Sequence, residues 1–148
     1  MRHAAAGDRD SWESSDESRP LTGAGRRQAQ GLLTVLEPHG VRATAAVLSS
    51  DYVRCRQTVE PLAAALALAV RDAAALREGS PLAAVLDLVA SCGDTVLCSH
   101  GDVVSELVLH LDVRGLLLDP PAWPKASTWV LGVTDGAVLS ARYVGPPA

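Results

Sequence analysis

The sequence predicts an α/β fold: a three-layer α/β/α sandwich with a mostly parallel sheet, closed by an antiparallel C-terminal edge hairpin. Two observations carry this prediction. Short apolar runs at residues 45–49 and 95–99 alternate with amphipathic segments, a pattern typical of parallel strands joined by crossover helices. Near the C-terminus, two strand-like runs flank Asp135-Gly136, a strong signal for a two-residue hairpin turn.

The size and composition indicate a single domain over residues 1–148. With 48% hydrophobic residues, 3% aromatics and no Phe, the chain can bury a core built of Leu, Val and Ala. The net charge of -4 argues against a general nucleic-acid binder, which needs a basic face. The longest apolar run, residues 62–70, is too short to span a bilayer, and no secretory signal is visible. We therefore expect a cytoplasmic protein without a membrane partner.

Amphipathic spacing predicts two helices in the first half of the chain. The first covers about residues 23–37, with Thr22 as its N-cap. The second follows the first strand, with Asp51 as its cap, and Pro61 either kinks it or restarts it. Residues 68–70 then form a weak strand candidate.

The second half repeats the alternation. Ser80-Pro81 is a good helix start, since it offers a capping hydroxyl and a proline at the first helical position. Another helix is expected from Gly101, directly after the strand at 95–99. The closing hairpin pairs residues 127–133 with residues 137–144.

A long polar segment, residues 4–21, connects the chain start to the first helix. It carries many charged and hydroxyl side chains and reads as a surface loop. Loops of this length in compact domains often carry function. Arg9 and Arg19 lie in it, and each is either a substrate contact or a solvated charge.

Two histidines and two arginines lie at the edges of predicted elements. Arg2-His3 opens the chain, Arg54 follows one buried strand and His100 follows another. Because ligands of open α/β sheets bind beyond the carboxyl ends of the strands, we expect these segments to converge at one rim.

Such a set suits phosphoryl transfer, in which catalysis is mostly positioning and charge stabilisation. Arginine meets two phosphate oxygens at once and stays charged, and a neutral imidazole can act as a nucleophile. The helix that begins after His100 adds free N–H groups. An acid is also required, because a leaving alkoxide or phosphate departs better when it is protonated.

Four motifs occur in order along the chain: Arg2-His3-Ala4, Arg19-Pro20-Leu21-Thr22-x-x-Gly25-x-x-Gln28-Ala29, Ser49-Ser50-x-x-x-Arg54-Cys55-x-Gln57-Thr58 and Ser99-His100-Gly101. Together they resemble the phosphoglycerate mutase-like histidine phosphatase superfamily, on its small SixA-like branch. The resemblance spans nearly the whole chain. Three further features are similar to the C-terminal phosphatase domain of actinobacterial MutT-type Nudix hydrolases: the Trp12 loop, Glu60-Pro61-Leu62-Ala63-Ala64 and Ser127-Thr128-Trp129-Val130-Leu131.

The resemblance implies a phosphatase that needs no metal or other cofactor. His3 would be the nucleophile and would form a phosphohistidine. Arg2, Arg54 and His100 would hold the phosphoryl oxygens.

The proton donor is less directly implied. Glu78 lies where the superfamily often places it, and Asp102 is the alternative, since a related branch has an acid directly after the second histidine. Here Gly101 intervenes. Ser49 either lines the pocket or is a turn residue, and Cys55 is expected to be a packed thiol.

The resemblance leaves the substrate open. The SixA-like branch implies phosphohistidine on a protein. The Nudix-linked group implies a nucleoside diphosphate or another small phosphorylated metabolite, with a possible functional link to a Nudix hydrolase. The alternative from another class is a non-catalytic phospho-ligand binding module that keeps Arg2, Arg54 and His100 as an anion pocket.

Members of this family place an apolar strand, usually central in the sheet, directly before the Arg-His pair. Only Met1 precedes the pair here, so we expect a domain truncated at its N-terminus relative to the family, without its usual first strand. A missing central strand would leave unpaired backbone groups on both neighbouring strands. We therefore expect the natural protein to begin upstream.

Overall fold

Helices and strands alternate along the chain in the predicted order. The computed structural model describes every residue from Met1 to Ala148. No helix combines the length and apolarity needed to cross a membrane. The elements are α1 (Gly23–Leu36), β1 (Ala46–Ser49), α2 (Val53–Ala65), β2 (Val70–Asp72), α3 (Leu82–Ser91), β3 (Thr95–Cys98), α4 (Gly101–Val113), β4 (Thr128–Thr134) and β5 (Ala137–Val144), with short 3-10 turns η1 (Asp16–Ser18), η2 (Glu37–His39), η3 (Val41–Ala43) and η4 (Ala74–Leu76).

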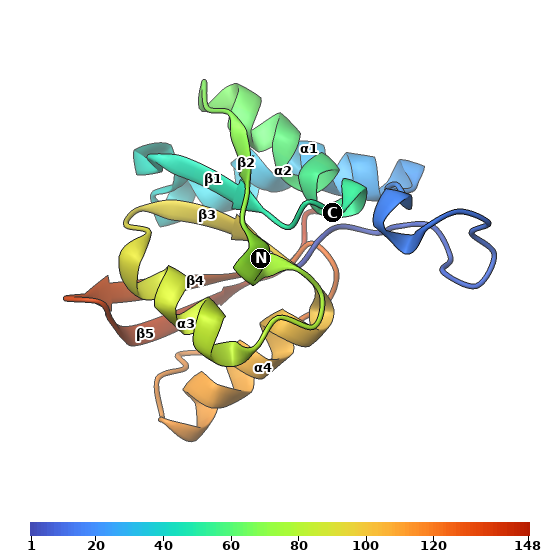
Figure 1. Cartoon of the computed structure of the whole chain (residues 1–148). Helices are drawn as coiled ribbons and strands as arrows, with labels where there is room; N and C mark the ends of the chain where they lie inside the picture. The colour runs from blue at the N-terminus through green and yellow to red at the C-terminus, as the bar shows by residue number, and fades with distance from the viewer.

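The strands form two groups between two layers of helices. Parallel strands lie in the order β2-β1-β3, and β4 and β5 form an antiparallel pair across Asp135-Gly136. In Figure 1, α1 and α2 lie above the strands, and α3 and α4 lie below them. This arrangement confirms the α/β sandwich and its C-terminal hairpin. Asp135 and Gly136 both have positive φ, as that tight turn requires.

The first residues of the chain link the two groups of strands at one end. Arg2 forms a parallel bridge with Ser99, and the N–H of His3 donates to the carbonyl of Ser99 at 2.9 Å. On the other side, the N–H of Arg2 donates to Ser127 at 3.0 Å, and the carbonyl of His3 accepts from Ala126 at 3.1 Å. The backbone of the Arg-His pair is therefore held from both sides.

Two predicted helix caps were wrong. Asp51 does not cap α2; the N-cap is Tyr52, and the Asp51 carboxylate pairs with Arg77 at 3.3 Å. The hydroxyl of Ser80 donates to the carbonyl of Ala74, so α3 begins one residue later behind Pro81. In both cases a partner outside the predicted helix takes the side chain that the local pattern assigned to a cap.

Two other elements, α2 and β2, are of the predicted type but differ from the prediction in where they begin or how far they run. The helix α2 runs through Pro61 without a break. The strand β2 begins at Val70, where pairing with Val47 of β1 begins, rather than at Leu68. Pairing with a neighbour, which the sequence does not display, decides where a weak strand starts.

The start of α1 packs closely on the N-terminal segment. Thr22 caps the helix as predicted, accepting the N–H of Gly25 at 3.1 Å. A Cβ on Gly25 would lie 1.9 Å from the carbonyl oxygen of Ala5. The glycine is therefore required for close contact between the helix and the segment that carries His3.

The substitution Gly25→Ala is expected to lower the free energy of unfolding by about 1–3 kcal/mol, because the Ala5 backbone must move. Chemical denaturation measures this loss. Gly23→Ala is the matched control in the same helix, since its Cβ would meet only the end of the Arg27 side chain at 3.8 Å. Equal effects of the two substitutions would contradict the packing argument.

Candidate active site

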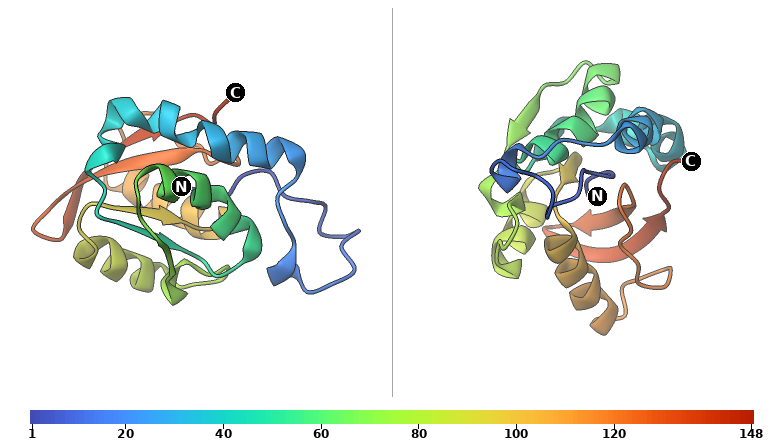
Figure 2. Two further views of the ribbon diagram at one scale, coloured as in Figure 1. Left: turned by 90° about the horizontal axis from the view of Figure 1, so that it is seen from above. Right: turned by 90° about the vertical axis from the view of Figure 1, so that its right-hand side faces the viewer.

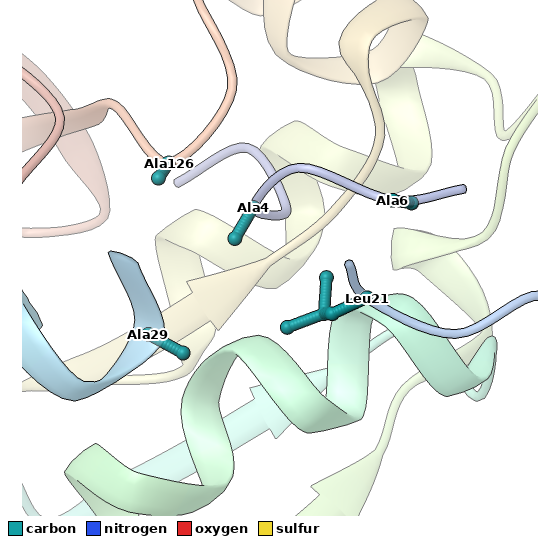
Figure 3. Packing of buried hydrophobic residues seen from close by; sticks show 5 residues of the cluster. All are labelled: Ala4, Ala6, Leu21, Ala29 and Ala126. Atoms are coloured by element: carbon teal, nitrogen blue, oxygen red, sulfur yellow. The ribbon is translucent and has the colours of Figure 1, made fainter. Parts of the chain in front are cut away.

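A small apolar cluster holds the segment that carries His3. It consists of Ala4, Ala6, Leu21, Ala29 and Ala126. Figure 3 shows the Ala4 side chain pointing toward Leu21 and Ala29. The N–H of Ala4 donates to the hydroxyl of Thr58 in α2 at 2.9 Å. His3 is thus fixed by backbone bonds on one side and by packing on the other.

The His3 ring has a defined tautomer. Its Nδ1 lies 2.8 Å from the carbonyl oxygen of Ala4. A carbonyl only accepts, so Nδ1 carries the proton and Nε2 keeps its lone pair. Burial lowers the pKa of His3 to about 3, and the positive charges of Arg54 and Arg2 act in the same direction. His3 is therefore a neutral imidazole with a free nitrogen at physiological pH.

His100 lies beside His3 and contacts Arg54. The two imidazole rings are 5.6 Å apart, edge to face. Nη2 of Arg54 lies 3.4 Å from Nδ1 of His100, and Nε2 of His100 lies 2.8 Å from the Ser50 hydroxyl. Since a guanidinium only donates, Nδ1 accepts and Nε2 donates to Ser50. Burial, followed by the charge of Arg54, lowers the pKa of His100 to about 4.

Two guanidinium groups each retain a buried N–H without a partner. Arg54, 1% exposed, donates to the Asp16 backbone carbonyl and carboxylate, yet its Nε is unpaired. Arg2 donates to the carbonyl of Trp123 at 2.8 Å, and its Nε is also unpaired. Buried donors without partners are rare and costly, so these two are candidate anion contacts.

The N-terminus of α4 lies next to Arg2. No side chain caps this helix at His100, so its first N–H groups are left for other partners. A Cβ on Gly101 would lie 2.9 Å from the guanidinium carbon of Arg2. Glycine at this position allows the arginine to lie directly against the helix start, where both add positive potential.

Asp16 in η1 was not foreseen from the sequence. Its carboxylate lies 2.8 Å from Arg19, 3.0 Å from Arg54 and 3.3 Å from Arg9. Burial alone would raise the pKa of Asp16, but the Arg19 hydrogen bond and the three positive charges hold it below its ordinary value. The i, i+3 spacing of Asp16 and Arg19 was the only available signal, and it is a weak one among the loop's many charges.

Both candidate acids lie at the same rim. Glu78 is ion-paired with Arg9 at 2.7 Å, and its other oxygen lies 3.7 Å from Arg54. The carboxylate of Asp102 accepts the N–H of Gly79 at 2.7 Å. Asp102 therefore holds the turn that carries Glu78.

These groups line an open polar pocket of about 670 Å³. Its lining includes most of the predicted site residues: Arg2, His3, Arg9, Arg19, Glu78, His100 and Asp102. Arg54 adjoins it through His100. Lys125 and Trp123 also line it, although the sequence analysis did not single them out. In Figure 2, the loop that bears Arg9 and Asp16 reaches beyond the end of the sheet.

Two residues near the pocket do not line it. Ser49 is fully buried and donates to the carbonyl of Ser50, whose hydroxyl, in turn, contacts His100. Cys55 is also fully buried, and burial raises the pKa of its thiol, which suits the predicted packed thiol. No group of three or more His, Cys, Asp or Glu side chains is arranged to hold a metal ion.

The profile of the histidine phosphatase superfamily (branch 1) matches residues 1–81, more than half of the chain. The protein belongs to the histidine phosphatase superfamily. Both the family and the phosphatase class expected from the sequence are thereby confirmed. The matched residues include three of the four motif segments and end just after Glu78.

A similar characterised protein is the 8-oxo-(d)GTP phosphatase of Mycolicibacterium smegmatis. It is 32% identical over 155 residues, covering 99% of this chain and 47% of the relative. The histidine phosphatase chain described here thus spans about half the length of that relative.

Solved structures of histidine phosphatases share the fold. The protein histidine phosphatase SixA complexed with tungstate superposes with a TM-score of 0.75 at 21% identity, covering 100% of this chain and 94% of the other. A putative SixA from Nakamurella multipartitia gives 0.66 at 27% identity, covering 99% and 93%. Mycobacterial glucosyl-3-phosphoglycerate phosphatase with inorganic phosphate gives 0.63 at 21%, covering 99% and 94%.

The role of Asp16 as the shared counter-charge of three arginines can be tested by measuring the free energy of unfolding. Asp16→Asn is expected to lower the free energy of unfolding at pH 7 by about 1–3 kcal/mol, because three arginines lose their shared counter-charge. Folding lowers the pKa of Asp16 below its unfolded-state value of 3.8. The stabilisation by Asp16 is therefore fully present above pH 3.8 and is lost as the pH falls through the pKa of Asp16 in the folded protein.

Chemical denaturation of both proteins between pH 7 and pH 3 measures the difference. Asp10→Asn in the same exposed loop is the control, with an expected effect near zero. A difference between Asp16→Asn and the parent that stays constant down to pH 3 would contradict the ionic role.

Proposed function

We propose that this protein is a phosphatase that acts through a phosphohistidine on His3. The observation that carries the proposal is the hydrogen bond from Nδ1 of His3 to Ala4, which leaves Nε2 unprotonated in a ring that lines a basic pocket. The unpaired Nε groups of Arg2 and Arg54 supply donors for phosphoryl oxygens. Nucleophile and anion contacts thus lie together at one rim.

The reaction proceeds in two displacements. Nε2 of His3 forms a bond to phosphorus while the bond to the leaving oxygen breaks, and the leaving oxygen takes a proton from the acid. Water then attacks the phosphohistidine, gives a proton to the same carboxylate and releases inorganic phosphate. Arg2, Arg54 and the start of α4 stabilise the charge on the equatorial oxygens in both steps.

Glu78 is the proposed acid. It lines the pocket, and one of its oxygens faces Arg54. Asp102 has one oxygen occupied by the N–H of Gly79, so we assign it the positioning of the Glu78 turn. The arginines supply the positive charge at the phosphoryl group, so the proposed reaction needs no metal or other cofactor.

For the substrate, we propose a nucleotide or another small phosphorylated metabolite. The open pocket of about 670 Å³ is of small-ligand size, and Arg9 and Lys125 add positive charge beyond the central arginines. Trp123 adds an aromatic side chain to the lining, which suits a base. The similar Mycolicibacterium protein is named an 8-oxo-(d)GTP phosphatase, which supports a nucleotide substrate. The proposal also includes a functional link to a Nudix hydrolase.

Replacement of the nucleophile is the direct test of the mechanism. His3→Ala is expected to lower kcat for an aryl phosphate by about 10³-fold or more, because no other group can take over the attack. Rapid quench into base should show a phosphoenzyme in the parent and none in the variant. His110→Ala, late in α4, is the control and should retain activity.

Turnover without a phosphoenzyme would contradict the covalent mechanism. Binding of phosphate by the parent without turnover would favour the non-catalytic binding module instead.

The pH dependence should reflect the low pKa values of both histidines. His3 and His100 have pKa values of about 3 and 4, so both stay neutral well below pH 6.5. The acid limb of kcat/KM, corrected for ionisation of the substrate phosphate, is therefore expected to have its midpoint near pH 4 or below. Steady-state assays from pH 3.5 to pH 8 measure it. A midpoint near 6.5 would mean that His3 is not buried in solution as described.

A release assay separates the candidate substrates. Equal concentrations of nucleoside diphosphate, nucleoside triphosphate and a phosphohistidine peptide are compared by kcat/KM. Higher values for the nucleotides, reduced in a Lys125→Ala variant, support the proposed class. A preference for the peptide, unaffected by Lys125→Ala, would establish the phosphohistidine alternative and overturn the nucleotide proposal.

A further inference from the structure

Asp16 contacts both terminal nitrogens of Arg54. Nη1 of Arg54 donates to the backbone carbonyl of Asp16 at 2.7 Å, and Nη2 donates to its carboxylate at 3.0 Å. The next carboxylate, that of Glu78, is farther from Arg54, at 3.7 Å. The almost completely buried Arg54 is therefore already bound to an anion that belongs to the chain itself.

Arg54 and Arg9 share the same two carboxylates. Nη2 of Arg54 lies 3.0 Å from Oδ2 of Asp16 and 3.7 Å from Oε2 of Glu78. Nη2 of Arg9 lies 3.3 Å from the same oxygen of Asp16 and 2.7 Å from Oε1 of Glu78. The four side chains form a closed ring of alternating charge. An anion that binds Arg54 must therefore compete with carboxylates that already balance its charge.

The competition concerns particular hydrogen-bond donors. A guanidinium that holds two oxygens of an anion uses two of its three nitrogens, so at least one terminal nitrogen takes part. Both terminal nitrogens of Arg54 donate to Asp16, and only Nε has no partner. A phosphoryl group that binds Arg54 through two oxygens therefore meets Asp16 at the same donors.

Repulsion between like charges adds to this competition. A phosphoryl oxygen on Arg54 and the Asp16 carboxylate would lie against one guanidinium group, where two negative charges repel strongly because water is partly excluded. A phosphate dianion carries twice the charge of a carboxylate, so it is the stronger partner for Arg54. The carboxylate is then the group that leaves.

The turn that carries Asp16 can move without opening the core. It is the three-residue η1, and none of its residues is buried. Away from Arg54, the Asp16 carboxylate keeps Arg19, whose Nε lies 2.8 Å from it. The ion pair of Glu17 with Arg77 also holds this turn, but it joins two exposed side chains, and such pairs are weak.

We propose that Asp16 is an internal competitor for the phosphoryl group at Arg54, and that a bound phosphate dianion displaces its carboxylate from Arg54. This inference rests on the proposed function, in which Arg54 contacts the phosphoryl oxygens. Return of the carboxylate to Arg54 after hydrolysis favours release of inorganic phosphate. Asp16 thus stabilises the free protein and weakens its affinity for phosphate.

Sulfate tests the competition, because it is a tetrahedral dianion that cannot form a phosphohistidine. Asp16→Asn is expected to bind sulfate about tenfold more tightly than the parent, measured by titration calorimetry at pH 7, since the competing charge is removed. Asp8→Asn is the matched control. Asp8 lines the same pocket, but its carboxylate accepts the N–H of Asp10. Its loss should change the affinity by less than about twofold.

Amide hydrogen exchange in the parent tests the displacement without any substitution. The N–H of Arg19 donates to the carbonyl of Asp16 at 3.2 Å, and Arg54 holds the same carbonyl. Saturating sulfate is expected to speed exchange at Arg19 by about threefold or more, because the turn loses its contact with Arg54. The N–H of Gly40 closes the similar turn η2 and is the control, with no acceleration expected.

Equal or weaker sulfate binding by Asp16→Asn would overturn the inference, and so would unchanged or slower exchange at Arg19. Absence of sulfate binding by both proteins would also overturn it, because Arg54 would then not contact an anion. None of these measurements involves turnover. A phosphoenzyme on His3 of the parent would therefore still support the proposed mechanism if the inference about Asp16 failed.

Discussion

The hydrogen bonds that hold the backbone of His3 are the constraint on which the site depends. Ser99 binds its N–H from the end of β3, and Ala126 binds its carbonyl from the segment before β4. These bonds set the position of the ring relative to His100 and leave Arg2 lying on the start of α4. The next residue, Ala4, both packs into the apolar cluster and fixes the tautomer of His3 through its carbonyl. Backbone placement and protonation state thus have a common origin.

Charge in the pocket is balanced by a loop rather than by the sheet. Arg54 is almost completely buried, and an isolated buried guanidinium would be strongly destabilising. The Asp16 carboxylate, in the loop before α1, compensates this charge and also pairs with Arg19 and Arg9. A substrate phosphate brings negative charge to the same arginines. The Asp16 loop therefore stabilises the buried arginines and lies close to the groups that would contact a phosphate.

The local sequence pattern predicted a structural feature correctly where the residues that form the feature are close together in the sequence. Thr22 caps α1 by accepting the N–H of Gly25, three residues away. The hairpin turn is formed by the adjacent residues Asp135 and Gly136, which both have positive φ. The Asp51 and Ser80 caps failed because Arg77 and the Ala74 carbonyl compete for those side chains. The same distinction applies to the site. The motifs singled out the histidines and arginines, whereas no local pattern distinguishes Asp16 from the other acids of its loop.

The sequence alone determined the order of helices and strands, the family and the residues with the chemistry for phosphoryl transfer, since these follow from periodicity and motif spacing. Only the tertiary structure decided that His3 and His100 are neutral, because burial and neighbouring charge depend on groups far apart in the chain. It also decided that Asp102 holds the Glu78 turn and that β3 and β4 line a common cavity instead of pairing. Distances between remote residues and the space left between strands arise only when the layers pack.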